Sequence, residues 1–470
     1  MSEPVWQWSA VDTARAIRAG EISSAAVVEA HLARMDAVNP AINAVVAPLH
    51  DEARKAARDA DRAQASGAAL GPLHGVPVTL KINVDVAGQA NSNGVVAFRD
   101  NIAREDSPVT ANLKRAGAII IGLTNTPEFS MRAFTDNPLH GLTLNPWDQT
   151  ITCGGSSGGA GASIAAGIGA IAHGNDIGGS LRWPAYCNGV VTIKPTQGRI
   201  PAFNPSASEE RPPMAQLMSV QGPLARSVAD VRLGFEVMAA PDPRDPWYAP
   251  VPLAGPPVSR KVAVARIPDD MACDDDVIAL YRQAAEHLAD AGYELHEVEV
   301  PELSKVWTLW RDLLFTELAV MQAPLMRQVG SGTFVRGIEA ALRSAPVMDI
   351  EGYMRSVSER TRLLRLWMTF LDEYPVLLTP LSVRRTPGPN ADIDGSGRNI
   401  MWETLRFLSS INVLGLPAAI VPVGLARGAP VGVQLVATRY REDLCLDAAA
   451  AIEQRAGRLV ENLWSMLDKR

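Results

Sequence analysis

Apolar residues in the first 67 positions recur three and four residues apart, with polar residues between them, which is the spacing of amphipathic helices. The stretch "SAVD" at 9–12 has the pattern of a capping box. Ser23 or Ser24 precedes the run "AAVVEAHLARMDAV", and a third amphipathic run is "HDEARKAARDADRAQA". The N-terminal 67 residues are therefore predicted to be helical.

Strand and helix patterns alternate in the next part of the chain. Short apolar runs rich in β-branched residues predict strands at "VPVTLKI", "AIIIGL" and "IAHGND". Between them, "SPVTANLKRAG" and "GAGASIAAGIG" predict helices. This alternation is typical of an α/β fold in which helices cover both faces of a sheet.

A proline-rich stretch at 241–260 is the best candidate for a linker or an excursion. After it, "KVAVARI", "DDDVIALYRQAAEHLADAG" and "YELHEVEV" predict a further β-α-β unit. Residues 301–372 are expected to be mainly helical, with Trp307, Trp310 and Trp367 in the core. Short strands then return at "YPVLLTPLS", "PAAIVPVG" and "GVQLVA".

Composition narrows the classes of function. The 470 residues are 47% hydrophobic and 20% charged, as in ordinary globular enzymes, and the net charge of −7 argues against a nucleic-acid or anionic-membrane surface. The four cysteines show no disulfide framework or zinc-ligand spacing, so no metal is expected. No signal peptide or membrane-spanning run is visible, and a cytoplasmic protein is expected.

Two lysines stand out because lysine is scarce, with only seven among the 44 basic residues. Lys81 in "GVPVTLKINVDV" and Lys194 in "GVVTIKPTQG" each interrupt a run that predicts a buried strand. Burial disfavours the charged amine, and a neutral lysine is a general base. Alternatively, each amine extends to solvent or pairs with a carboxylate.

The glycine-rich stretch from Thr152 to Ser180 contains four serines and admits three interpretations. A phosphate-binding loop fails, because no lysine follows the glycines as that motif requires. Ser156 and Ser157 both match the G-x-S-x-G elbow of Ser-His-Asp hydrolases, but the preceding "LNPWDQTITC" is polar and turn-rich where a buried strand is expected.

The third interpretation joins the two ends of this stretch. In "DIGGS" the backbone amides of Ile177, Gly178, Gly179 and Ser180 can converge on one point, as an oxyanion hole requires. A serine hydroxyl needs a base, and no histidine has an aspartate in register. A desolvated lysine acting through a second serine would serve.

The segment 154–201, "GGSSGGAGASIAAGIGAIAHGNDIGGSLRWPAYCNGVVTIKPTQGRIP", closely resembles the signature of the amidase signature family, hydrolases with a Ser-Ser-Lys catalytic set. Further similarity lies in "GPLHGVPVTLKINVDVAG", "DSPVTANLKRAGAIIIGLTNTPEF" and "GLPAAIVPVGLARGAPVGVQLVA". The resemblance implies one compact domain with a large twisted mixed sheet. Its expected parts are N-terminal helices at 1–67, a signature core at 68–240, a variable substrate-side region at 250–400 and a return to the core at 401–470.

The resemblance implies that Ser180 is the nucleophile, Ser156 the bridging serine after a cis peptide bond, and Lys81 the base. The amides of residues 177–180 would form the oxyanion hole, and Lys194 would be structural. No cofactor is implied. The expected substrate is a small amide, cleaved by a broad-specificity amidase or aryl acylamidase acting as a monomer or homodimer. A carbamate or synthetic oligoamide hydrolase is the alternative, and a non-catalytic or amidotransferase-type subunit is a third reading.

Overall fold

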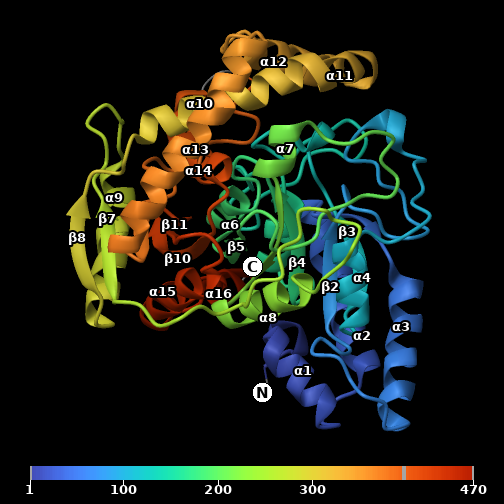
Figure 1. Ribbon diagram of the computed structural model, residues 1–470. Helices are drawn as coiled ribbons and strands as arrows, with labels where there is room; N and C mark the ends of the chain where they lie inside the picture. The colour runs from blue at the N-terminus through green and yellow to red at the C-terminus, as the bar shows by residue number, and fades with distance from the viewer. Residues whose placement is uncertain (1–2, 394–397, 468–470) are drawn as a thin grey trace.

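The computed structural model describes residues 3–393 and 398–467. Within these residues, eleven strands form one sheet in the order β1-β3-β2-β4-β6-β5-β10-β11-β9-β7-β8 (Figure 1). Strand β2 pairs in parallel with β3 and β4, and β7 with β8 and β9, whereas β10 pairs antiparallel with β5 and β11. The sheet is therefore mixed, as the sequence predicts.

The strands carry the following bounds: β1 Val45–Pro48, β2 Pro77–Lys81, β3 Ile119–Thr124, β4 Ile171–Asp176, β5 Val191–Lys194, β6 Val220–Ala225, β7 Lys261–Ala265, β8 Glu294–Val298, β9 Val376–Pro380, β10 Ala418–Ala426 and β11 Ala429–Val436. The α-helices are α1 Ala10–Arg18, α2 Ser24–Ile42, α3 His50–Ala65, α4 Pro108–Arg115, α5 Gly158–Ala165, α6 Arg182–Asn188, α7 Pro213–Met218, α8 Val228–Met238, α9 Asp275–Asp290, α10 Leu303–Glu317, α11 Ala323–Val329, α12 Gly332–Leu342, α13 Ile350–Glu373, α14 Arg398–Leu414, α15 Glu442–Ala456 and α16 Val460–Leu467.

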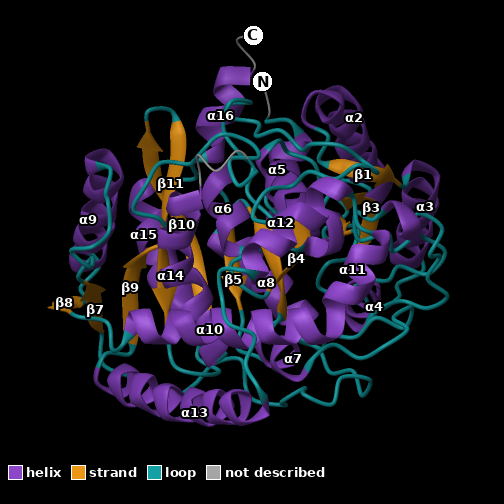
Figure 2. Ribbon diagram, turned by 90° about the horizontal axis from the view of Figure 1, so that it is seen from above, coloured by secondary structure: helices purple, strands orange, loops and turns teal. Residues whose placement is uncertain are grey.

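Helices cover both faces of the sheet because neighbouring residues of a strand point to opposite sides. In β10, Val421 packs in the core cluster that contains residues of α8 and α15, while Ile420 packs in the cluster that contains residues of α5 and α6. Figure 2 shows the strands lying between helices. The predicted arrangement of helices on both faces is confirmed.

The predicted starts of the first two helices are also confirmed. The Ser9 side chain accepts a hydrogen bond from the Asp12 amide at the beginning of α1. Ser23 does the same for the Ala26 amide at the beginning of α2, so Ser23 is the cap and Ser24 is the first helical residue.

The proline-rich stretch at 241–260 is an excursion and does not link two independent cores. Strand β7, which follows it, pairs with β9 in the same sheet that contains β1–β6. Residues 303–373 form α10–α13 with one π-helical turn, η4 (Leu318–Gln322), and these helices lie over one end of the sheet (Figure 1). The mainly helical character predicted for 301–372 is confirmed.

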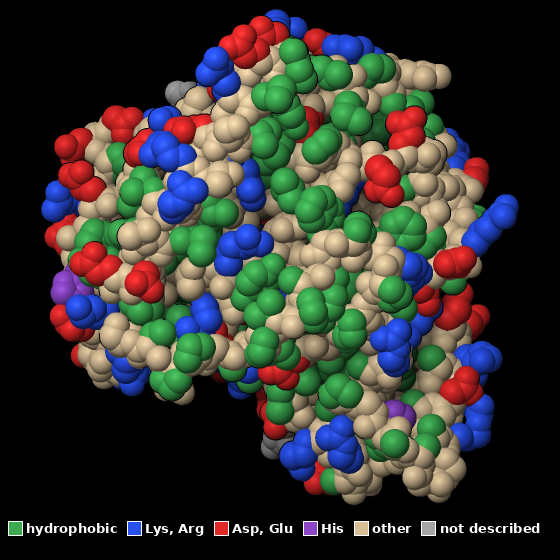
Figure 3. Space-filling view, in the orientation of Figure 1, with side chains coloured by type: hydrophobic (Ala, Val, Ile, Leu, Met, Phe, Trp, Pro, Cys, Tyr) green, Lys and Arg blue, Asp and Glu red, His purple; other side chains and the backbone are tan. Residues whose placement is uncertain are grey.

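The surface in Figure 3 mixes basic and acidic side chains, and apolar side chains reach it across the upper part of this face. Exposed apolar residues on the helices at this end include Val320, Met321 and Ile350. Among the residues that the structure describes, no helix is long and apolar enough to cross a membrane.

Candidate active site

Lys81 is the last residue of β2, and its side chain is fully buried. The Nζ atom lies 2.7 Å from the Ser156 Oγ, 3.1 Å from the Ser157 Oγ and 2.8 Å from the Asn175 Oδ1. Burial lowers the pKa of Lys81 well below its usual value, and the nearby Asp176 only partly opposes this effect. The amine is therefore set up to be neutral.

The neighbours of a neutral Lys81 fix where its hydrogens and its lone pair point. The Asn175 Oδ1 can only accept, so it takes one amine hydrogen. The Ser157 hydroxyl donates to the Asn175 carbonyl at 3.3 Å, so its oxygen accepts the second amine hydrogen. The lone pair of the amine is left facing the Ser156 hydroxyl, the arrangement that a general base requires.

The two serine segments lie side by side. Ser156 follows a cis peptide bond from Gly155 and is buried in the loop before α5. Ser180 lies between the end of β4 and α6, and its carbonyl accepts a hydrogen bond from the Ser157 amide at 3.2 Å. The structure thus places the Lys81 amine against Ser156, and it places Ser156 and Ser180 on the lining of one cavity. These are the three residues that the resemblance implies as a set.

The backbone at 177–180 presents three of its four amides without an internal partner. The Gly179 amide donates to the Asp176 carboxylate at 2.7 Å. Within the described chain, the amides of Ile177, Gly178 and Ser180 donate no hydrogen bond. Of the four predicted oxyanion-hole amides, Gly179 is therefore committed to the loop, and the other three remain available to a ligand.

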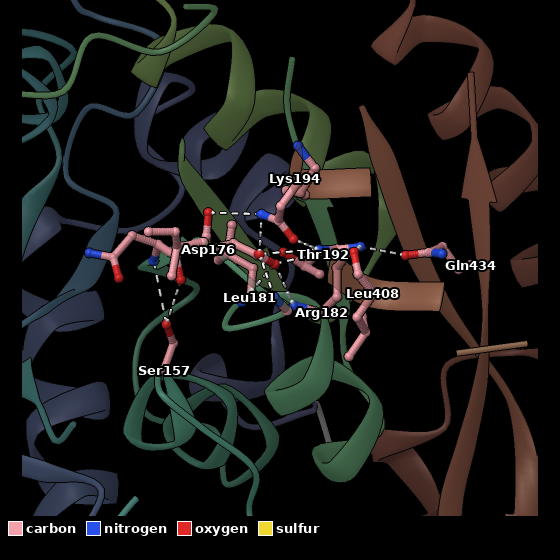
Figure 4. A network of polar contacts seen from close by, with 12 residues as sticks. Ser157, Asp176, Leu181, Arg182, Thr192, Lys194, Leu408 and Gln434 are labelled. Atoms are coloured by element: carbon pink, nitrogen blue, oxygen red, sulfur yellow. Dashed lines mark hydrogen bonds and ion pairs between the residues drawn. The ribbon is translucent and has the colours of Figure 1, made fainter. Parts of the chain in front are cut away.

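A buried ion pair holds this loop in place (Figure 4). The Arg182 Nε lies 3.0 Å from the Asp176 carboxylate, and both side chains are fully buried. Burial alone would raise the pKa of Asp176, but Arg182, Lys194 and the hydrogen bond from Asn412 together outweigh it, and the net effect lowers this pKa. Arg182 also donates to the Gln434 side chain at 2.7 Å and to the Asn412 side chain at 2.6 Å.

Two cavities meet at Ser180. The larger, of about 790 Å³, is bordered by both Ser156 and Ser180 and by polar side chains such as Asn83 and Gln221. The smaller, of about 160 Å³, is mainly apolar and is lined by Ser180, the glycines before it and the side chains of Met131, Trp183, Trp310, Leu314, Phe315, Met401 and Leu408. Ser180 is thus the point at which a larger cavity of mixed polarity and a smaller, mainly apolar cavity join.

The second buried lysine does not join this site. The Lys194 Nζ donates to the Pro195 carbonyl at 2.8 Å. Burial, followed by the charge of Arg182, lowers the pKa of Lys194 to about 7. Its hydrogen bond to the backbone agrees with the structural position that the resemblance implies.

Some neighbours of the site were not found from the sequence. In the sequence, Asn175 is only a polar residue near the end of a predicted strand. Asn83, the second such neighbour, donates a hydrogen bond of 2.9 Å to the Ser130 hydroxyl.

Trp310 and Trp367 lie in a buried core cluster, as expected, whereas Trp307 is only half-buried. Trp310 also borders the small cavity, and Trp367 borders neither cavity.

Other chemistries find little support among the described residues. No group of three or more histidine, cysteine, aspartate or glutamate side chains is placed to hold a metal ion there. Cys153, three residues before Ser156, is buried, and burial raises the pKa of its thiol to about 12. It is therefore a small buried residue and not a thiolate nucleophile.

Comparisons with known proteins agree with this geometry. The family model described as Amidase matches residues 26–446. The chain is 60% identical to the indoleacetamide hydrolase of Bradyrhizobium diazoefficiens, over 99% of this chain and 90% of that protein. It is 32% identical to an acylamidase of Rhodococcus erythropolis, over 96% of each chain.

A solved structure of a bacterial aryl acylamidase of the amidase signature family superimposes on all of this chain and all of its own, with a TM-score of 0.84 and 26% identity. The family model alone spans most of the sequence, and the fold comparison agrees with it. The chain therefore belongs to the amidase family, and it is a hydrolase of amide carbon–nitrogen bonds.

Proposed function

We propose that Ser180 attacks the amide carbonyl and that Ser156 and Lys81 remove its proton. The observation that carries the proposal is the 2.7 Å contact between the Lys81 Nζ and the Ser156 Oγ, with Ser156 and Ser180 bordering one cavity. The lone pair of Lys81 takes the proton of Ser156, which takes the proton of Ser180 as the Ser180 Oγ bonds to the carbonyl carbon.

The negative charge that develops on the carbonyl oxygen is stabilised by the available amides of Ile177, Gly178 and Ser180. The proton then passes back through Ser156 to the leaving nitrogen, the carbon–nitrogen bond breaks, and an ester to Ser180 remains. Water, activated through the same relay, attacks this ester and releases the acid. The larger cavity, which has polar side chains such as Asn83 and Gln221 in its lining, gives room for the amine and for water.

We further propose an arylacetamide of the indole-3-acetamide type as the preferred substrate. The proposal rests on the 60% identity to an indoleacetamide hydrolase and on the apolar cavity beside Ser180. Cavities that take whole drug-sized ligands measure about 300–1,000 Å³. The smaller cavity, at about 160 Å³, suits one aromatic acyl group, with the carbonyl at Ser180 and the nitrogen toward the larger cavity.

A labelling experiment tests the roles of the serines. A fluorophosphonate probe should add to Ser180 of the wild-type protein and not to the Ser180→Ala variant. Ser156→Ala and Lys81→Met should still be labelled at Ser180, but more slowly, because the nucleophile remains and its base is lost. Mass spectrometry of the labelled peptide decides the assignment, and an adduct on Ser156 or Ser157 would contradict it.

A substrate panel tests the acyl preference. Indole-3-acetamide should be hydrolysed with a higher kcat/KM than acetamide, an anilide or an aryl carbamate, with the released ammonia, amine or alcohol quantified. A carbamate as the best substrate would favour the alternative of a carbamate hydrolase. Turnover by the purified chain alone would argue against a non-catalytic subunit, and size-exclusion chromatography would test the proposed monomer or homodimer.

We also retain the proposal of a cytoplasmic location. Its support is the spacing of the four cysteines, which is not that of the structural disulfides found in oxidising compartments. Fractionation of cells that produce the protein tests it, and recovery from the periplasmic or secreted fraction would contradict it.

A further inference from the structure

Trp310 connects the helices at one end of the molecule to the loop that precedes the nucleophile. It lies on α10, and its side chain is almost completely buried. The indole Nε1 donates a hydrogen bond of 2.9 Å to the carbonyl of Ile177. A helix in the region that the sequence marks as variable therefore contacts the backbone of the signature loop directly.

The same ring also packs against the next residue. A Cβ atom added to Gly178 would lie only 2.5 Å from the Trp310 Cζ2, closer than non-bonded carbon atoms approach. Position 178 thus has no side chain because the indole ring occupies that space. The close packing restricts how far this part of the loop can rotate.

These two contacts fix the direction of one amide. The Ile177 carbonyl and the Gly178 amide belong to a single planar peptide unit, in which C=O and N–H of a trans bond point in opposite directions. When Trp310 holds the carbonyl on one side, the Gly178 N–H is turned to the other side. Asp176 holds the following peptide unit in the same way, through the Gly179 amide.

Trp310 also borders the apolar cavity that opens at Ser180. An acyl group seated there would contact the ring that orients the Gly178 amide. Resting on the function proposed above, we infer that Trp310 is a positioning residue that aims the Gly178 N–H at the developing oxyanion and links acyl-group binding to oxyanion stabilisation.

The central test is Trp310→Phe, which keeps an aromatic ring and removes the N–H donor. Its matched control is Trp367→Phe, because the Trp367 Nε1 also donates to a backbone carbonyl, that of Pro301, at 2.9 Å, but outside both cavities. With indole-3-acetamide, kcat of Trp310→Phe should fall about tenfold or more, since loss of a complete oxyanion donor costs about 100- to 1,000-fold. Trp367→Phe should retain kcat within about threefold.

Two inhibitors separate positioning from a general loss of packing. An indolylmethyl trifluoromethyl ketone forms a tetrahedral adduct with the serine and needs the oxyanion amides, whereas 3-ethylindole has the ring and no carbonyl. Trp310→Phe should weaken the ketone by about the same factor as kcat and change the 3-ethylindole constant by less than about threefold. Equal weakening of both, or an unchanged kcat, would overturn the inference.

A second variant covers the case in which Trp310→Phe does not fold. Gly178→Ala introduces a methyl group against the ring and should turn the same peptide unit, lowering kcat and ketone affinity together. An unchanged ketone affinity in Gly178→Ala would contradict the inference. If the wild-type protein itself fails to hydrolyse arylacetamides, the substrate proposal fails, and the ketone comparison can still be made with any accepted acyl group.

Discussion

The two hydrogens of the Lys81 amine are directed by Asn175 and Ser157, so the strength of the base depends on side chains that carry no charge. An uncharged acceptor orients the amine without stabilising its protonated form as a carboxylate would. Burial lowers the pKa of Lys81, and the uncharged Asn175 oxygen at 2.8 Å does not oppose this effect as a carboxylate at the same place would.

Asn175→Asp tests this dependence on charge. A carboxylate at this position would favour the ammonium form and raise the pKa of Lys81. The proposed mechanism requires the neutral amine, so the alkaline rise of kcat/KM should move to higher pH by about one unit or more, and activity at pH 7 should fall about tenfold. Asn83 contacts Asn175 and not Lys81 itself, so the charge in Asn83→Asp lies farther from the amine. This variant should shift the pH profile in the same direction but by less. An unchanged pH profile in Asn175→Asp would contradict this account.

Lys194 should affect stability and not catalysis. Its pKa is lowered to about 7 in the folded protein, mainly by burial, while an unfolded chain has a value of about 10.4. Between these values the unfolded state binds more protons, so this lysine makes the free energy of unfolding rise with pH.

Lys194→Met should remove that contribution, which is up to about 1.4 kcal/mol per pH unit. Urea titrations at several pH values between 7 and 10 measure it, and the variant should keep its amidase activity. Lys81→Met, in contrast, should fold and be inactive. An inactive but normally folded Lys194→Met would reverse the two roles.

The contact between Lys81 and Ser156 was anticipated through the family resemblance, because two scarce lysines in apolar runs look alike in the sequence and left the choice between Lys81 and Lys194 open. Asn175 and Trp310 were not anticipated as neighbours of the site, because an asparagine in a strand and a tryptophan in a helix look alike whether they face a site or a core. The occupied Gly179 amide was also hidden, because its partner Asp176 is recognised only from the fold of the loop.

At the scale of elements, the helices over one end of the sheet contact buried carboxylates, Glu317 on α10 and Glu128 in η3 (Glu128–Ser130). Glu317 of α10 accepts hydrogen bonds from the amides of Met214 and Ala215 at 2.7 and 2.9 Å, where α7 begins. It also accepts one from the Tyr353 hydroxyl of α13. One carboxylate therefore joins three helices.

Glu317→Ala should leave these donors without their acceptor and lower the free energy of unfolding by about 1.5–3 kcal/mol. Glu317→Gln should have a smaller effect because it keeps one oxygen acceptor. Glu339→Ala is the control, since Glu339 pairs with Arg327 on the surface, where ion pairs contribute about 0–1 kcal/mol. Urea denaturation compares the three, and equal losses for Glu317→Ala and the control would contradict the proposed junction.

Hydrophobic periodicity predicted helices and strands correctly where the apolar runs were long or rich in β-branched residues. The stretch "IAHGND" corresponds to β4, and 301–372 contains the expected helices. Strand β6 was not predicted, because "VQGPLA" contains glycine and proline, which ordinarily argue against a central strand. This segment is a strand because it pairs with β4 on one side and β5 on the other, and not because its own residues favour strand structure.

Across the whole molecule, the two halves of the chain share one sheet and one polar core. Strand β5 of the first half pairs with β10 of the second, and the buried Glu442 pairs with Arg199. The family resemblance predicted one compact domain. Hydrophobic periodicity alone could not predict it, because periodicity does not say which distant strands pair in the sheet.

A chain cut in the proline-rich stretch should stay assembled. A protease site inserted between the exposed Leu253 and Val258 should be cleaved without separating the fragments, because the contacts between the halves lie in the sheet and not in this segment. Size-exclusion chromatography of the cleaved protein should give one peak with most of the original amidase activity. Two separate inactive fragments would show that the connection itself maintains the fold.

The partners of Arg182 also determine when the enzyme becomes competent during its synthesis. Lys81, Ser156 and Ser180 are synthesised in the first half of the chain. Arg182, however, donates to the carbonyl of Leu408 and to the side chains of Asn412 and Gln434, which are synthesised much later. Until those residues are synthesised, the Arg182 guanidinium, which pairs with Asp176, lacks these three acceptors. The loop at 177–180, which Asp176 holds through the Gly179 amide, then lacks part of its support. We therefore expect an unfinished polypeptide to carry Lys81, Ser156 and Ser180 without amidase activity until Gln434 of β11 has been synthesised.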